Sequence, residues 1–337
     1  MPTIHAYAAH RAGAPLEPFS YDPGPLGEEE VEIEVESCGI CHSDLSVVND
    51  EWGISRYPVV PGHEVIGRVV AAGRGVRGLK VGDRVGVGWN AGSCLACDVC
   101  VAGNGHLCAG AQATIVGHHG GFATHVRSHW LWAIPVPPGL DPMKAGPLMC
   151  GGMTVFSPLL NFGTRPVHRV GVVGIGGLGH LAVLFARAWG CEVTALTSNL
   201  EKADDLRRMG AQHVVSSRDA AALRQLAGTL DLVIVTVNVP MDWPLLLGAL
   251  APQGRLHVVG AVLEPIPVSA FGLIVGERQV SGSPTGSPWA LRQMLRFAAR
   301  HRIEPQVEVF GLSKVNDALA HLAAGKARYR VVLDPRR

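Results

Sequence analysis

The 337-residue sequence has no apolar stretch long enough to cross a membrane. A spanning helix needs roughly 18 to 20 consecutive apolar residues, and each longer apolar run here is interrupted by Gly, Pro or a charged residue. The 29 Lys and Arg residues, set against 28 Asp and Glu, do not gather into a basic stripe. Because nucleic acids and anionic membranes are bound through concentrated positive charge, we expect neither as a partner.

The first residues also lack the features of a secretory leader. MPTIHAYAAHRAG contains no apolar segment after a basic start, so we expect a cytoplasmic protein. The cytoplasm keeps thiols reduced, and the eight cysteines are therefore candidates for metal ligation before disulfide formation. With 47% hydrophobic and 17% charged residues, the composition predicts a packed globular protein. A chain of this length favours two domains.

Two kinds of pattern divide the chain near residue 150. Before it, runs of alternating polarity such as VEIEVESCGI and GDRVGVG stand between Gly and Pro residues, which predicts a β-rich, partly barrel-like region. After it, strand-like and helix-like segments alternate, which favours a doubly wound parallel sheet. We predict the α/β class, with a catalytic domain of residues 1–148 and 287–337 and a dinucleotide-binding domain of residues 149–286.

One loop holds four cysteines within fifteen residues: Cys94, Cys97, Cys100 and Cys108. Four thiolates can complete a tetrahedral zinc site, and a closed shell of this kind is structural because no position remains for substrate. An iron–sulfur cluster also uses the C-x2-C-x2-C spacing, but its bacterial form continues with x3-C-P, whereas this chain has x7 before the last cysteine. We favour structural zinc over an iron–sulfur cluster and over free or redox-active thiols.

A second set of metal-ligand residue types is scattered along the chain: Cys41, His63, Glu64 and Cys150. Each one alone is weak evidence, since a single cysteine is usually a small core residue. Their settings, GICHSD, PGHEVIG and PLMCGG, are turns flanked by Gly or Pro, where side chains from separate strands can converge. Two thiolates and an imidazole, with one position left open, are what a catalytic zinc ion requires.

A glycine-rich turn lies between a predicted strand and a predicted helix. Gly174, Gly176 and Gly179, with Gly177 and Leu178 between them, form the pattern G-x-G-x-x-G in this context. Its glycines permit a tight turn and let the backbone approach a pyrophosphate at the helix N-terminus. The sequence therefore predicts a dinucleotide-binding site.

The end of the second predicted strand, EVTALT, bears on the kind of dinucleotide. NAD sites place an acidic residue there to bind the ribose 2′-hydroxyl. This chain has Thr197, Ser198 and Asn199 instead, with Lys202 one turn later, and these groups can bind a 2′-phosphate. Glu201 is a contrary signal. The sequence favours NADP(H) over NAD(H).

Motifs along nearly the whole chain resemble those of one enzyme family. They are CGICHSDLS, RYPVVPGHEVIGRVV, VGDRVGVGW, AGPLMCGGMTVFSPL, GVVGIGGLGHLA, SGSPTGSP and GKARYRVVLD. The chain resembles the zinc-dependent medium-chain alcohol dehydrogenases of the cinnamyl-alcohol-dehydrogenase-like branch, and within it bacterial NADPH-dependent aldehyde reductases of broad range. The resemblance implies a GroES-like catalytic domain, a Rossmann domain, two zinc ions per chain, a homodimer, and reversible reduction of aldehydes to primary alcohols.

The resemblance also implies roles for the scattered ligand set. Cys41, His63 and Cys150 would bind the catalytic zinc ion. Glu64 would be the adjacent acid that can replace water as the fourth ligand. Asp44 would accept a hydrogen bond from the far ring nitrogen of His63 and so fix its tautomer.

A proton path to the alkoxide is implied as well, with one departure from the family pattern. Ser43 matches the hydroxyl that passes the proton. Many relatives carry a histidine five residues after the first zinc cysteine, where this chain has Ser46. A hydroxyl can pass a proton but cannot hold one near neutral pH, so either His42 or water would end the relay.

Contacts with the cofactor follow from the same resemblance. Thr154 and Leu178 would contact the nicotinamide, Val259 and Ala261 would present backbone groups to its carboxamide, and Arg330 would reach the pyrophosphate. For Leu178, Val259 and Ala261, core packing explains the residue type equally well.

Large apolar side chains near the zinc motifs suggest the substrate. Trp52, Trp89 and Met153 are candidates to line an apolar pocket, although ordinary packing would account for each. No Arg or Lys adjoins the zinc ligands in sequence, so aliphatic or aromatic aldehydes fit better than phosphorylated sugars or keto acids. The alternatives are an NAD-linked alcohol dehydrogenase, a zinc-free quinone reductase on the same plan, and a non-catalytic dinucleotide sensor with structural zinc alone.

Overall fold

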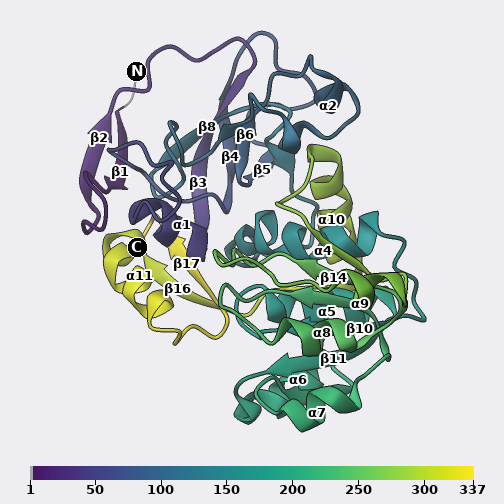
Figure 1. Cartoon of the computed structure of the whole chain (residues 1–337). Coiled ribbons are helices and arrows are strands. Elements are labelled where there is room, and N and C mark those ends of the chain that lie inside the picture. The colour runs from purple at the N-terminus through teal and green to yellow at the C-terminus, as the bar shows by residue number, and fades with distance from the viewer. Residues whose placement is uncertain (1–2) are drawn as a thin grey trace. The chain divides into compact units, whose positions relative to one another are not determined.

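The computed structural model describes residues 3–337, which form two compact units (Figure 1). The first unit extends to Met153 and resumes from Thr285 to Arg337. The second unit is the intervening segment Thr154–Pro284. Each unit has its own sheet, so each is described separately.

A seven-stranded sheet organises the first unit. Its longest strand, β3, pairs antiparallel with β4, β8 and the C-terminal strand β17, which itself pairs parallel with β16. Strand β5 lies between β4 and β9. The strands are β3 (Glu30–Ile40), β4 (Val65–Ala72), β5 (Arg84–Val87), β8 (His125–His129), β9 (Ile134–Pro135), β16 (Val307–Gly311) and β17 (Arg330–Asp334). The predicted β-rich character of this region is confirmed.

Smaller elements complete the first unit. Two two-stranded sheets pair β1 (Ile4–Ala8) with β2 (Glu17–Tyr21) and β6 (Asn90–Gly92) with β7 (Gln112–Ala113). The helices are α1 (His42–Val48), α2 (Asp98–Val101), α3 (Pro142–Ala145), α10 (Pro288–His301) and α11 (Val315–Ala323).

The burial pattern of strand β3 changes along its length. In its first half, Ile33 and Val35 are buried in the core while Glu34 is exposed, which is the period-two pattern of a strand with one wet face. From Ser37 to Ile40 every residue is buried. The strand therefore carries the residue that follows it, Cys41, into the protein interior.

The second unit contains a six-stranded parallel sheet with the order β12-β11-β10-β13-β14-β15. If these strands are numbered 1 to 6 along the chain, their order across the sheet is 3-2-1-4-5-6, as in a doubly wound dinucleotide-binding fold. The strands are β10 (Arg169–Val173), β11 (Glu192–Thr197), β12 (His213–Ser216), β13 (Leu230–Val235), β14 (Leu250–Val258) and β15 (Gln279–Gly282). The predicted parallel sheet is confirmed.

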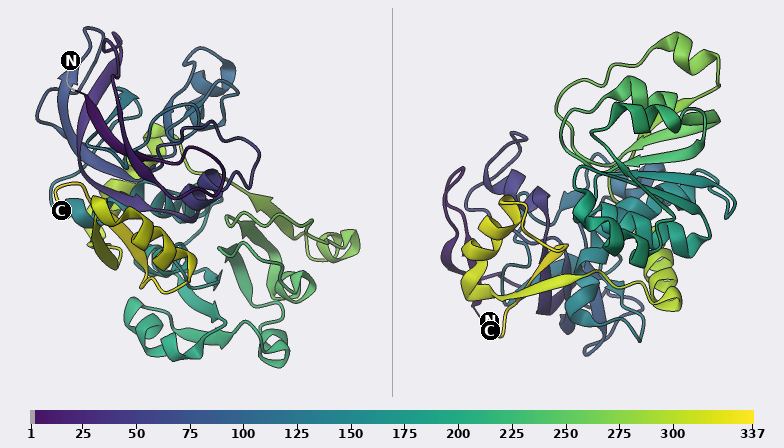
Figure 2. Two further views of the ribbon diagram at one scale, coloured as in Figure 1. Left: turned by 90° about the vertical axis from the view of Figure 1, so that its left-hand side faces the viewer. Right: turned by 90° about the horizontal axis from the view of Figure 1, so that it is seen from below.

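Helices lie on both faces of this sheet (Figure 2). They are α4 (Gly151–Asn161), which begins in the first unit, α5 (Gly179–Trp189), α6 (Ala203–Met209), α7 (Ala220–Gln225), α8 (Trp243–Gly248) and α9 (Ala270–Ile274). Gly190 ends helix α5 at a φ of 101°, a left-handed conformation that glycine adopts without steric cost. Among residues 3–337, no helix is both long enough and apolar enough to cross a membrane.

An ion-pair cluster on strand β3 makes the stability of the first unit depend on pH. Glu36 accepts hydrogen bonds from Arg84 at 2.7 and 3.1 Å and from Arg68 at 3.0 Å, which links β3 to β4 and β5. Burial alone would raise the pKa of Glu36, but the hydrogen bonds and charges of Arg84 and Arg68 outweigh it and hold the pKa below its usual 4.5. A carboxylate with a lowered pKa stabilises the folded state above its unfolded pKa, and this contribution is lost as the pH falls through the folded value.

We therefore expect Glu36→Gln to lower the free energy of unfolding at pH 7, with the difference from the parent narrowing as the pH falls below about 4. Urea unfolding at a series of pH values measures this. The control is Glu34→Gln, two residues along the same strand, where the side chain is exposed. Equal effects of the two variants, or a difference that does not change with pH, would contradict the role given to Glu36.

Candidate metal centres and dinucleotide turn

Four scattered residues of the first unit converge on one point: Cys41, His63, Glu64 and Cys150. One ligand atom from each lies within 4.8 Å of the others. Cys41 follows β3, His63 and Glu64 precede β4, and Cys150 follows the short helix Gly146–Met149. His63 and Glu64 are fully buried, and the two cysteines are less than a tenth exposed. The structure therefore brings together the second predicted ligand set.

Strand pairing and two glycines explain how these segments meet. Cys38 pairs with Val65 in the β3–β4 register, and the N–H of Gly39 donates to the carbonyl of Glu64 at 2.9 Å. A Cβ on Gly39 would lie 2.0 Å from Oε2 of Glu64, and one on Gly146 would lie 2.6 Å from the Glu64 carbonyl. Side chains at either position would separate the segments that carry the ligands.

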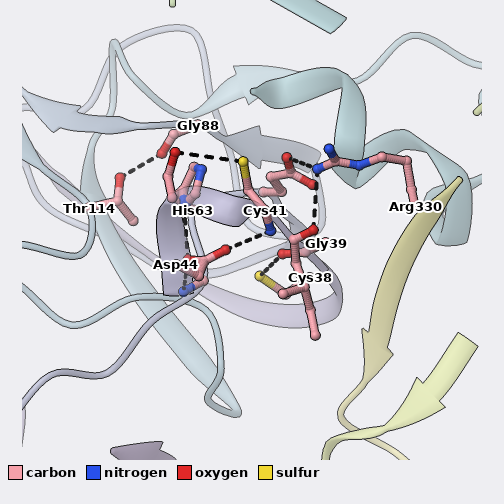
Figure 3. A network of polar contacts seen from close by, with 12 residues as sticks. Cys38, Gly39, Cys41, Asp44, His63, Gly88, Thr114 and Arg330 are labelled. Atoms are coloured by element: carbon pink, nitrogen blue, oxygen red, sulfur yellow. Dashed lines mark hydrogen bonds and ion pairs between the residues drawn. The ribbon is translucent and has the colours of Figure 1, made fainter. Parts of the chain in front are cut away.

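The carboxylate of Asp44 links the segments that carry Cys41 and His63 (Figure 3). Its Oδ2 accepts from the backbone N–H of Cys41 at 2.8 Å, and its Oδ1 accepts from the N–H of Gly62 at 2.9 Å. The same Oδ1 lies 2.9 Å from Nδ1 of His63, and both side chains are fully buried. Because a carboxylate accepts, this contact assigns the proton to Nδ1 and leaves a lone pair on Nε2.

Two atoms of the cluster are buried without a hydrogen-bond partner among the described residues: Nε2 of His63 and Oε2 of Glu64. Such atoms are costly unless something else binds them. The hydrogen bond from Cys150, together with His63, holds the pKa of Cys41 well below its usual 9.0, which favours a thiolate. Sulfur, imidazole nitrogen and carboxylate oxygen form a donor set suited to a divalent cation such as zinc. The residues present fit such an ion.

Arg330 is part of this cluster, which the sequence did not indicate. Its Nη2 donates to Oε1 of Glu64 and also lies 3.4 Å from the carbonyl of Ile40 (Figure 3). Burial raises the pKa of Glu64 to about 7, an effect that the charge of Arg330 opposes. The pairing engages Oε1 of Glu64, while Oε2 lies against Gly39.

The serines beside the cluster have separate partners. Oγ of Ser43 lies 3.7 Å from Sγ of Cys41. Ser46 is buried, and its hydroxyl donates to Oε2 of Glu51 at 2.7 Å. The carboxylate of Glu51 is exposed, and the hydrogen bond from Ser46 lowers its pKa. Glu51 therefore occupies the place for which the sequence suggested His42 or water.

Two of the three predicted pocket residues lie next to the cluster. The ring of Trp89 is 5.1 Å from that of His63 in an edge-to-face arrangement, and the ring of Trp52 is 6.0 Å from that of Trp89. Both tryptophans pack on an apolar group that includes Ile115. Met153 is fully buried, and its side chain lies against the backbone of residue 286.

The four-cysteine loop forms a second sulfur cluster. Sγ of Cys108 lies 3.4 Å from that of Cys94 and 3.8 Å from that of Cys97, and Cys94 lies 3.9 Å from Cys100. Backbone N–H groups of residues 96 and 97 lower the pKa of Cys94 to about 6, which favours a thiolate. Four sulfurs this close, none in a disulfide, fit one tetrahedral ion and leave it no open position.

The glycine-rich turn connects β10 to α5 in the second unit. Gly174 has a φ of 85°, and a Cβ on Gly179 would lie 1.9 Å from the Gly174 carbonyl, so the turn itself requires both glycines. A Cβ on Gly176 would meet no atom within 4 Å. The backbone at Gly176 is therefore open to a ligand, as a pyrophosphate at the start of a helix requires.

Several of the residues predicted to contact the ribose make hydrogen bonds within the protein. The hydroxyl of Thr197 bonds the backbone of Asn199, and Oδ1 of Asn199 accepts from the N–H of Glu201 at 2.8 Å. Nζ of Lys202 donates to the carbonyl of Ile175 in the glycine-rich turn at 3.0 Å. The structure therefore engages three of the predicted donors within the protein.

The predicted nicotinamide contacts are spread over several elements. Thr154 is buried in helix α4, and Leu178 is half-buried at the N-cap of α5. The N–H of Val259 donates to the carbonyl of Val235 at 3.0 Å, so only its carbonyl remains to meet a ligand. Ala261 is exposed.

Both units match known protein families. Residues 27–138 match the family described as alcohol dehydrogenase GroES-like domain, and residues 177–300 match that described as zinc-binding dehydrogenase. The chain is 54% identical over 330 residues to the aldehyde reductase AdhA of Synechocystis sp., with 98% of each protein covered. It is 40% identical to the probable cinnamyl alcohol dehydrogenase 6 of Arabidopsis thaliana, covering 97% of this chain and 93% of that protein.

Solved structures resemble the chain over nearly its whole length. The cinnamyl alcohol dehydrogenase SbCAD4 of Sorghum bicolor matches with a TM-score of 0.95 at 39% identity, covering 99% of this chain and 98% of that one. The cinnamyl alcohol dehydrogenase of Helicobacter pylori, in complex with NADP(H), matches with a TM-score of 0.92 at 30% identity and 99% coverage of both chains.

The three hydrogen bonds of Asp44 lead to a prediction about metal binding. We expect Asp44→Asn to weaken binding of a divalent metal at the Cys41 cluster by about 10- to 100-fold, because an amide cannot accept from all three N–H groups as the carboxylate does. Competition with a chelator, followed by metal analysis of the protein, measures the change. Asp83→Asn, in a turn where the carboxylate accepts from the N–H of Lys80, is the control. Unchanged metal retention in Asp44→Asn would contradict the prediction.

Proposed function

The chain belongs to the zinc-dependent medium-chain alcohol dehydrogenases, in their cinnamyl-alcohol-dehydrogenase-like branch, and from that premise we propose that it reduces aldehydes to primary alcohols with NADPH in a reversible reaction. The observation that carries the proposal is the buried cluster of Cys41, His63, Glu64 and Cys150. Membership of the family confirms the resemblance seen in the sequence. It also removes the zinc-free quinone reductase, since both metal-ligand clusters are present.

We assign the catalytic domain to residues 1–148 and 287–337 and the dinucleotide-binding domain to 149–286. We further propose two zinc ions per chain, one at each cluster. Cys41, His63 and Cys150, with Glu64 as a possible fourth ligand, would hold a zinc ion, which would supply Lewis acidity toward a carbonyl oxygen. The four thiolates from Cys94 to Cys108 serve structure alone, since they fill a tetrahedron.

The residues around the first cluster have separate tasks in this proposal. Asp44 orients the imidazole of His63 through its hydrogen bond at Nδ1. The hydroxyl of Ser43, whose Oγ lies 3.7 Å from Sγ of Cys41, would pass a proton to the substrate oxygen. The buried hydroxyl of Ser46, in helix α1, donates to the exposed carboxylate of Glu51. This bond connects the helix to solvent, at the position where other family members have a histidine.

The surroundings of the cluster favour uncharged substrates. Trp89 and Trp52 provide an aromatic wall beside His63, whereas Met153 stays a predicted lining residue. Nη2 of Arg330 donates to Glu64, so much of the charge of this guanidinium is compensated within the cluster. The aromatic wall suits an apolar substrate, and we propose aliphatic and aromatic aldehydes.

The cofactor site is proposed on the glycine-rich turn, Gly174, Gly176, Gly177 and Gly179, with the pyrophosphate at the start of α5. Thr154 and Leu178 would contact the nicotinamide, backbone groups of Val259 and Ala261 its carboxamide, and Arg330 the pyrophosphate. NADP(H) is favoured over NAD(H) because Thr197, Ser198 and Asn199 put no acidic residue at the end of strand β11.

The test is a screen of the purified protein with aldehydes and alcohols against NADPH and NADH at equal concentrations, with zinc counted per chain. We expect turnover of aldehydes with NADPH to exceed that with NADH, and two zinc ions per chain. Cys150→Ser should lose one zinc ion and lower kcat by about a hundredfold or more, because it removes a ligand of the catalytic ion. The control is Cys191→Ser, a buried cysteine of the second unit.

Other outcomes would favour the alternatives. Faster alcohol oxidation with NAD than with NADP would favour an NAD-linked alcohol dehydrogenase. One zinc ion per chain, with function retained in Cys150→Ser, would favour a dinucleotide-sensing protein that has structural zinc alone.

A homodimer joined through the dinucleotide-binding domains is also proposed; a cytoplasmic location stays a prediction. Strand β15 is an outer strand of the parallel sheet, and an outer strand can pair with its symmetry copy. In the segment that joins β14 to β15, four large apolar side chains are at least 70% exposed: Leu263, Phe271, Ile274 and Val275. A patch of this kind marks an interaction surface, and a second copy would cover it.

We expect the double variant Phe271→Asp, Ile274→Asp to be monomeric, because each change puts a charge into the buried interface. Light scattering coupled to gel filtration gives the mass of the parent and the variant. Val167→Asp changes an apolar residue of the same unit that is 78% exposed and lies outside the patch, and it should remain dimeric. A monomeric parent, or a variant that still dimerises, would contradict this interface.

A further inference from the structure

Two cavities of the second unit meet at Ser198 and Arg218. The first has a volume of about 360 Å³ and extends from Gly174 past Arg218 to Asp242. The second, of about 580 Å³, contains Ser198, Glu201 and Arg218. Both lie beyond the carboxyl ends of β10, β11 and β12, which is where ligands bind to doubly wound sheets.

The donors predicted from the sequence do not supply a cation to these cavities. The ammonium of Lys202 donates to the carbonyl of Ile175, and the side chains of Thr197 and Asn199 bond the backbone of their own loop. Ser198 is exposed and lines both cavities. A hydroxyl alone would be a weak site for a group with two negative charges.

Arg218 supplies the missing charge. It follows strand β12, and its backbone N–H donates to Oγ of Ser216 at 3.3 Å, which anchors the turn that carries it. Its side chain is exposed, and within residues 3–337 the guanidinium makes no hydrogen bond or ion pair. Among the described residues, it is also the one Arg or Lys that lines either cavity.

We propose that Arg218, with Ser198, recognises the 2′-phosphate of the adenosine ribose and so determines the preference for NADP(H). This inference rests on the proposed function of the chain. A guanidinium presents paired N–H donors to a phosphate and can also stack on the adenine ring. Val237, Val239 and Met241 give the first cavity an apolar wall for that base.

The acidic residues around Arg218 are engaged elsewhere. Oδ1 of Asp219 accepts from N–H groups at the start of α7, and Oδ1 of Asp242 accepts from the N–H of Leu245. Oε2 of Glu201 accepts from the amide of Asn199 at 3.3 Å. No carboxylate of the described residues pairs with Arg218, so its charge remains available to a phosphate.

The experiment compares the parent with Arg218→Ala, Arg218→Lys and the control Arg224→Ala, an exposed arginine of helix α7 that lies outside both cavities. Calorimetry measures binding of 2′,5′-ADP and 5′-AMP, which differ only in the 2′-phosphate. Steady-state assays measure KM for NADPH and NADH. Thermal unfolding checks that the exposed substitutions leave the fold unchanged.

We expect Arg218→Ala to weaken 2′,5′-ADP binding at least about tenfold and to raise KM for NADPH by a similar factor, with a much smaller change for 5′-AMP and NADH. Arg218→Lys should recover part of the loss, because it restores the charge without the paired donors. Arg224→Ala should bind as the parent does.

Two results would overturn the inference, and they separate it from the proposed function. If the parent binds 2′,5′-ADP no better than 5′-AMP, the proposed preference for NADP(H) fails and the role of Arg218 fails with it. If the parent prefers 2′,5′-ADP and Arg218→Ala keeps that preference, NADP(H) stands as the cofactor and Arg218 alone is excluded.

Discussion

The metal-ligand cluster depends on the hydrogen bonds that the buried carboxylate of Asp44 accepts. A fully buried anion is tolerated only when hydrogen bonds compensate its desolvation. Asp44 accepts from three N–H groups, on Cys41, Gly62 and His63, and these lie on two loops that the sequence separates by twenty residues. The contacts that stabilise the carboxylate therefore also fix the spacing of a thiol and an imidazole before any ion binds. Because the ligands are held in place in advance, little of the free energy of metal binding is lost in ordering them.

Close approach of backbone segments is the second constraint, and both units meet it with glycine. Gly39 and Gly146 let three segments of the first unit converge around Glu64, and Gly179 lets helix α5 begin against the carbonyl of Gly174. In each case the space of one Cβ separates a working geometry from a steric clash. Gly176 differs, because its face is open and the space is left for a ligand.

Charge is distributed in each unit so that few cations are left unpaired near the chemistry. Nη2 of Arg330 donates to Glu64, so the two charges compensate each other within the first cluster. Lys202 binds the glycine-rich turn, and among the described residues Arg218 is the one Arg or Lys that lines the cavities beside strand β11.

The sequence determined the fold class, both cysteine-containing clusters and the glycine-rich turn. Periodicity and spacings between near neighbours set the fold class, the four-cysteine loop and the turn. The scattered set around Cys41 followed from its ligand types and from the family resemblance along the whole chain. Only the tertiary structure decided the partners of long side chains. Glu64 and Arg330 are 266 residues apart, and Lys202 reaches a carbonyl 27 residues away instead of the ribose site. Arg218 lines the cavities for the same reason. The end of a flexible side chain goes where packing from distant segments leaves a partner or a space, and no local pattern in the sequence records that outcome.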